Sequence, residues 1–226
     1  MSALKGVVYD GGLQRQALPG DVAAWAETIA NLTTVGAGTL TAALLLSGII
    51  NRTGPVAGYI DTTDSAANIV AALVSNYNFQ ATGLTGVSSG VAAPVGMTVR
   101  LKFINTVAFA NTVAAGTGVT LVNATVNASS VKEYLLTVTN GTPQQVFAAN
   151  QTNASAVITG LSQFQTSQLS VGMLVTGTNI PGSTTIISIQ PGVGVTLSAN
   201  ATATLALNAL TFAPTVTLTG LGQGLL

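Results

Sequence analysis

The last 93 residues of the chain, from Tyr134 to Leu226, contain no Asp, Glu, Lys, Arg or His. Thr, Ser, Asn, Gly, Ala and Val predominate there, and the β-branched members of this set favour strands. A segment of this length cannot cover itself with the charged residues that ordinary soluble surfaces use. We therefore expect β-structure whose outer faces are neutral and rich in hydroxyl groups.

The composition also excludes whole classes of chemistry. The chain has no His and no Cys, so imidazole acid–base catalysis, thiol nucleophiles, disulfides and most transition-metal sites are ruled out. We expect a structural or binding protein that is not an enzyme and has no cofactor or metal. A hydrolase built on Ser and Asp alone is the catalytic alternative, and it would lack the usual histidine base.

The small number of charges also bears on which molecules the chain can bind. A monomer of this size exposes roughly 9,500 Å², so the twelve charges amount to about one per 800 Å² by the same scaling. Such a surface predicts a closed homo-oligomer, most simply a homotrimer; the alternative is a monomer covered by Thr, Ser, Asn and Gln. Six scattered cations argue against nucleic acid as a partner. The apolar run Ala42 to Ile50 is too short for a membrane span.

The periodicity predicts a mainly β fold with two small β-sandwich or barrel-like modules of jelly-roll type, one or two short helices and an N-terminal arm. Residues 1–40 form the arm, with a short helix expected from Asp21 to Leu32. Residues 41–150 form the first β-domain, and residues 151–226 form an uncharged C-terminal β-domain. Further strands are expected at residues 119–126, 134–139, 156–158, 173–176, 185–189, 195–197, 204–210 and 216–218.

Three local patterns refine the first domain. A helix is expected near residues 63–76, with Thr63 or Asp64 as its cap. In the strand Met97 to Ile104 the residues Thr98, Arg100 and Lys102 share one face, which we expect to be solvated or to lie between subunits. Asn140-Gly141 predicts a hairpin turn.

One further pattern bears on chemistry. Asp61 and Asp64 flank the helix start, and we interpret them as a turn and a cap; the alternative is a Ca²⁺ site or an acid–base pair.

Several segments together resemble a family. LLLSGIINRTGP, DTTDSAANIVAALV, VGMTVRLKFINTV and AAGTGVTLVNATVNASSVKEYLLTVTN follow one another between residue 41 and about residue 140. This order is similar to that of small β-rich virion proteins of tailed bacteriophages, which decorate or cement the capsid or form head fibres. The later segments VGMLVTGTNIPGSTTIISI and VTLSANATAT resemble a module of phage tail-fibre and other virion proteins.

The resemblance implies a homotrimer on the capsid exterior of the virion, assembled in the host cytoplasm and bound to the major capsid protein. The arm carries five of the twelve charges and the sole Trp, and such residues anchor interfaces. We therefore predict capsid contact through Lys5, Arg15 and Trp25; the alternative places Trp25 under the first β-domain. The rival functions are a tail-fibre or spike subunit and a carbohydrate-binding module.

Overall fold

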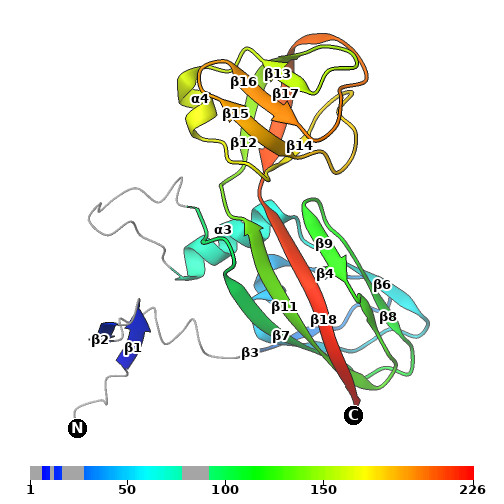
Figure 1. Ribbon diagram of the computed structural model, residues 1–226. Coiled ribbons are helices and arrows are strands. Elements are labelled where there is room, and N and C mark those ends of the chain that lie inside the picture. The colour runs from blue at the N-terminus through cyan, green and yellow to red at the C-terminus, as the bar shows by residue number, and fades with distance from the viewer. Residues whose placement is uncertain (1–6, 11–12, 17–27, 78–91) are drawn as a thin grey trace.

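The computed structural model describes residues 7–10, 13–16, 28–77 and 92–226 of the chain (Figure 1). Its secondary structure is predominantly β with three short helices among these residues, which confirms the predicted mainly β class. The strands β1 (Val7–Asp10) and β2 (Leu13–Gln16) pair as an antiparallel ribbon of their own. All other described strands belong to three larger sheets.

The largest sheet of the body is mixed and has six strands in the order β3-β5-β7-β11-β18-β9. β7 and β18 are both antiparallel to the central strand β11, whereas β3–β5, β5–β7 and β18–β9 are parallel pairs. The strands are β3 (Thr28–Leu32), β5 (Gly48–Arg52), β7 (Thr98–Asn105), β9 (Val119–Val122), β11 (Ser130–Asn140) and β18 (Thr215–Leu225).

A second sheet and two helices complete the body. The four-stranded sheet has the order β10-β8-β6-β4, and side chains from both sheets and from helix α3 pack into one buried cluster that includes Leu40, Ile69, Phe103, Val113 and Leu136. The body is therefore a β-sandwich-like pair of layers with a common core. The elements are β4 (Thr39–Leu40), β6 (Tyr59–Thr63), β8 (Asn111–Ala114), β10 (Thr125–Val126), α2 (Ala42–Leu45) and α3 (Ala66–Tyr77).

The uncharged part of the chain forms a second module, a closed six-stranded barrel. Its strand order is β14-β17-β12-β13-β16-β15, and the two end strands also meet: the Ile186 N–H donates to the Met173 carbonyl at 3.0 Å and the Val175 N–H to the Thr184 carbonyl at 2.7 Å. The elements are β12 (Gln145–Gln151), β13 (Val157–Thr159), α4 (Gln163–Ser167), β14 (Leu174–Thr176), β15 (Ile186–Gln190), β16 (Gly194–Leu197) and β17 (Leu205–Ala213).

The barrel has its own core, and its two end strands are joined where residues 172–175 meet residues 184–186. Ile158, Met173, Val195, Leu210 and Phe212 are among the side chains buried inside it. Closure removes the unpaired N–H and C=O groups that make a sheet edge prone to pairing with other chains.

The barrel is inserted into a hairpin of the body. Asn140 at the end of β11 and Thr215 at the start of β18 are paired Cα partners, and residues 141–214 leave and return between them, so that the barrel stands at one end of the large sheet (Figure 1). The sheets therefore divide the chain at residues 141 and 214, and not at residue 150 as the composition had suggested, since β18 belongs to the body although it is uncharged.

Three local predictions were wrong. Residues 28–32 form a strand and not the end of a helix, because their backbone pairs in parallel with β5. Asn140-Gly141 makes no tight hairpin, because the chain enters the barrel there and returns only at Thr215. Gly141 is needed for another reason: a Cβ at this residue would collide with the backbone of Ala93. The helix cap is Ser65, whose Oγ accepts the Asn68 N–H at 3.2 Å.

The apolar run at residues 42–50 divides between helix α2 and strand β5, with Leu45 and Ile50 in the core. Among the described residues no helix is both long and apolar enough to cross a bilayer.

Candidate functional site: the outer face of the six-stranded sheet

The face of the six-stranded sheet that points away from the shared core is the most distinctive exposed surface of the described chain. Strand alternation divides β7 and β11 cleanly: Leu101, Phe103, Tyr134 and Leu136 point into the core, and their neighbours point outward. We call this surface the outer face. Its central residues are Thr98, Arg100, Lys102 and Ile104 of β7 and Val131, Glu133, Leu135 and Thr137 of β11.

The register arranges these residues in rows across the sheet. Residues directly opposite each other in neighbouring strands have their Cβ atoms about 5 Å apart. The β7–β11 pairing sets Ile104 opposite Val131, Lys102 opposite Glu133, Arg100 opposite Leu135 and Thr98 opposite Thr137. The outer face therefore has an apolar row, a row of opposite charges and a hydroxyl row, with a mixed row of Arg100 and Leu135 between the last two.

Charge is concentrated on this face. Seven charged residues have described side chains, and three of them, Arg52, Asp61 and Lys132, are fully buried. Asp64 stands beside the start of α3. The remaining three, Arg100, Lys102 and Glu133, all lie on the outer face. Arg100 and Lys102 share their face with Thr98, as the alternation predicted.

Threonines extend the outer face toward the barrel. Thr98, Thr137, Thr217 and Thr120 form one row over four adjacent strands. The Thr98 and Thr137 hydroxyls lie 3.1 Å apart, and the Thr139 hydroxyl donates to Thr215 Oγ1 at 2.8 Å. These pairs hold the side chains in fixed orientations and leave hydroxyl groups available to a partner.

The buried charges serve the fold. Arg52 contacts Asp61 through its Nε at 2.9 Å and its Nη2 at 3.0 Å, and its remaining donors hold the carbonyls of Leu32, Thr34, Gly36 and Thr53. This ion pair therefore fixes the loop after β3 against the body. Asp61 is neither a turn residue nor free for catalysis, which contradicts the turn interpretation.

Tyr59 belongs to the same buried group. Its ring lies 4.6 Å from the Arg52 guanidinium carbon, and its hydroxyl donates to Asn105 Oδ1 at 2.8 Å. Burial, assisted by the charge of Asp61, raises the pKa of Tyr59 to about 12. The hydroxyl therefore stays protonated at neutral pH and acts as a fixed donor.

Lys132 is the third of the fully buried charges. Its Nζ donates to the Asn123 and Thr125 carbonyls, both at 2.6 Å, and to Asn123 Oδ1 at 3.0 Å. Burial lowers the pKa of Lys132. The ammonium group ties the connection between β9 and β10 to the large sheet, where Asn123 has a left-handed backbone with φ of 56°.

Asp64 accepts hydrogen bonds at the start of the helix. Its carboxylate receives the Ala42 N–H at 3.1 Å, the Ser65 N–H at 2.8 Å and the Asn68 amide at 2.7 Å. Partial burial would raise the pKa of Asp64, but these three hydrogen bonds outweigh it and lower the pKa. In the described residues no group of three or more acidic side chains comes together as a metal site would require.

The exterior of the barrel is neutral and partly apolar. Its exposed large side chains include Val146, Val157, Phe164, Ile187 and Leu207. They are scattered over strands, a helix and a bulge, with Thr and Ala between them. No charge interrupts this surface, because residues 134–226 contain none.

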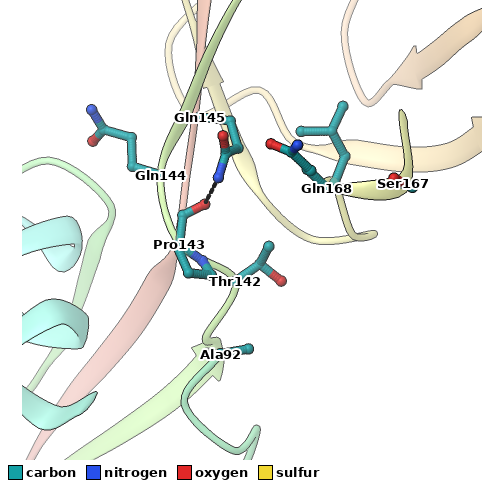
Figure 2. Close-up of a pocket in the computed structure, with 8 residues that line it drawn as sticks. Ala92, Thr142, Pro143, Gln144, Gln145, Ser167 and Gln168 are labelled. Atoms are coloured by element: carbon teal, nitrogen blue, oxygen red, sulfur yellow. Dashed lines mark hydrogen bonds between the residues drawn. The ribbon is translucent and has the colours of Figure 1, made fainter. Parts of the chain in front are cut away.

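Two clefts lie where the barrel meets the body. One has a volume of about 660 Å³ and is lined by Ala92, Thr142, Pro143, Gln144, Gln145, Ser167, Gln168 and Leu169. Figure 2 shows the amides of Gln145 and Gln168 along its wall, with Gln145 Nε2 directed at the Pro143 carbonyl. The other, of about 420 Å³, contains the hydroxyl groups of Thr117, Thr120, Thr176, Ser183, Thr185 and Thr215. Neither described lining includes a charged or catalytic group.

The predicted capsid contacts are not brought together by the described structure. Lys5 and Trp25 lie outside the described residues, and Arg15 lies in β2 with its backbone paired to Val8. Their role stays a prediction. Sequence reasoning found Arg100 and Lys102 but missed Glu133 as part of the same surface. The signal was the unbroken alternation along β11, which points Lys132 inward and Glu133 outward.

Comparison with known proteins gives no relative: no family model, no curated protein and no solved structure matches the chain.

Proposed function

We propose that the chain is a structural virion protein that binds the outer surface of a bacteriophage capsid and decorates or cements it, without catalysis. The observation that carries this proposal is the use of charge in the described residues. Three charged side chains brace the interior, one accepts hydrogen bonds at a helix start, and three lie on one exposed sheet face. Such a distribution suits a surface that binds another protein and offers no reactive group to a substrate.

The barrel supports the same proposal. A sheet whose end strands are joined to each other and whose exterior is neutral tolerates dense packing beside other protein surfaces, because little of its edge is open and no charge must be desolvated. It is held at one end of the large sheet by two strands (Figure 1). In this proposal the N-terminal arm contacts the major capsid protein, and the barrel forms the projecting part of the decoration.

The test is binding of purified protein to capsids that lack it, measured by co-sedimentation and by imaging of the particles. We expect saturable binding to the exterior of the shell. Removal of residues 2–20 should abolish binding while the protein stays folded, since the arm carries the predicted contacts. Full binding by the truncated protein would move the capsid contact to the body. Location on the tail instead of the head would favour the fibre alternative, and absence from particles would overturn the proposal.

A further inference from the structure

We infer that the outer face is a contact between two copies of this chain, packed face to face around a two-fold axis that runs parallel to the strands between β7 and β11. The inference goes beyond the proposed function and does not depend on a capsid, and it puts a dimer in place of the homotrimer expected from the sequence. It follows from the symmetry of the sheet about this line and from the residues that the symmetry brings together.

The strand order places the axis at the centre of the sheet. In β3-β5-β7-β11-β18-β9 three strands lie on each side of the line between β7 and β11. A rotation by 180° about an axis parallel to this line, about 5 Å above the outer face, stacks β7 on β11 of the second copy, β5 on β18 and β3 on β9. Two sheets that stack face to face keep their strand directions within about 30°, so the whole face can be covered in one contact.

The rows of the outer face are complementary under this rotation. Each residue of β7 meets the residue that lies opposite it in β11, now contributed by the second copy. Lys102 meets Glu133, Ile104 meets Val131, and Thr98 meets Thr137. Opposite charges, apolar groups and hydroxyls are each matched with a suitable partner, as a two-fold contact requires of its surface.

Arg100 adds to the match. It lies two residues before Lys102 on the same face and opposite Leu135. In the stacked pair its aliphatic part covers Leu135 of the second copy, while its guanidinium lies diagonally beside Glu133 of that copy. Each Glu133 therefore faces one cation directly and a second one diagonally.

Among the described residues these charges have no ion-pair partner. Lys102 and Glu133 are opposite residues, yet the described residues contain one ion pair, Arg52–Asp61, and it lies in the interior. The apolar members Ile104, Val131 and Leu135 are half-buried, and Ile29 at the edge of the face is 64 % exposed. A second copy would satisfy both the charges and the apolar side chains.

The outer face is large enough for a specific contact between two copies. Six strands about 4.8 Å apart, with the length of β7, span a plane of roughly 600 Å². Side chains make the accessible surface larger than this plane. A standard protein contact buries about 800 Å² per partner, so that this face matches what a specific dimer needs.

The test uses charge reversal and mixing of variants. K102E leaves only carboxylates in the central charged row, and E133K leaves only ammonium groups. Each variant alone should therefore be monomeric, with a dimer dissociation constant raised at least about tenfold. An equimolar mixture of the two variants should form a heterodimer, because the carboxylates at positions 102 and 133 of one copy then face the ammonium groups at positions 133 and 102 of the other. Native mass spectrometry distinguishes this heterodimer from either homodimer.

The mixture separates contact between copies from effects within a copy. A charge pair inside one chain cannot be restored by adding a different chain. The matched control is S188E, which adds a carboxylate at an exposed position of the barrel and should leave the dimer intact. Monomeric or trimeric wild-type protein, dimers that persist in both single variants, or a mixture without heterodimer would each overturn the inference. Capsid binding is measured separately, by co-sedimentation with particles and by its loss on removal of residues 2–20, so that failure of the dimer and failure of the proposed function are distinguishable.

Discussion

At the scale of single residues, each buried cation of the described chain binds several oxygen atoms at once. Arg52 reaches two carboxylate oxygens and four carbonyls from one buried position. Lys132 has three oxygen partners and no carboxylate among them. Each of these groups replaces several separate contacts, and each would be costly to leave without its partners.

Removing the partner of Arg52 tests this cost. D61N leaves the guanidinium buried without its counter-charge, so we expect a loss of about 3–5 kcal/mol in the free energy of unfolding, measured by urea denaturation. The control is S188A, which removes an exposed hydroxyl of the barrel and should change the free energy by less than about 0.5 kcal/mol. A similar small effect of D61N would mean that the pair is not what holds the loop.

Asp64 predicts a dependence of stability on pH. Its pKa is lower in the folded protein, so its contribution is fully present above the pKa of the unfolded chain and is lost as the pH falls through the folded value. D64N should therefore lose about 1 kcal/mol at neutral pH, because an amide oxygen accepts the Ala42 and Ser65 N–H groups less strongly than a carboxylate does. The variant should also show a flatter decrease in stability below pH about 4. Parallel curves for variant and wild type would contradict this role.

The residue patterns were predictable where they depend on neighbours in sequence. The alternation of Thr98 to Phe103 gave both faces of β7 correctly. The partners of Arg52 and Asp61 were not predictable, because they come from separate segments that only the fold brings together. The helix expected up to Leu32 failed for the same reason: pairing with β5 decides the conformation there, and the pairing is not visible in the local sequence.

At the scale of elements, the insertion between β11 and β18 determines the organisation. The two strands are a hairpin of the body whose loop has been replaced by a complete barrel. Most barrel strands were predicted to within two residues, but their assignment to one closed unit was not. Asn140 and Thr215 pair across 74 intervening residues, and no local signal indicates that the chain returns.

The insertion predicts that the body folds without the barrel. Deleting residues 141–214 and joining Asn140 to Thr215 through Asn-Gly should restore a two-residue hairpin between strands that are already paired. We expect a soluble protein that keeps the body's strand content, measured by circular dichroism and by nuclear magnetic resonance. The same deletion joined without the two-residue linker is the control, since it leaves no room for a turn. An unfolded product with the linker would show that the barrel is needed for the body.

At the scale of the whole molecule, body and barrel have separate cores. The buried cluster of the body draws on both of its sheets and on α3, whereas that of the barrel uses residues between Ala149 and Phe212. Two crossing segments connect them, near residues 141–144 and at Pro214. Each unit therefore meets the condition for independent cooperative unfolding.

Calorimetry should resolve this independence. We expect two heat-absorption transitions for the full chain and loss of one of them, at an unchanged temperature for the other, in the variant that lacks residues 141–214. D61N should shift the transition of the body and leave that of the barrel in place. One transition that moves as a whole in D61N would indicate a single cooperative unit.

The two chain segments that connect the barrel to the body also determine how a pulling force on the barrel reaches the large sheet. Both of its connections join the same end of two neighbouring central strands, β11 and β18, and the hydrogen bonds of a sheet lie across the strands. A pull on the barrel along these strands acts on them together, in shear against β7 and β9, so that many hydrogen bonds resist at once. A sideways pull would open them one after another. We therefore expect the protein to resist force better in the direction in which the barrel projects than across it.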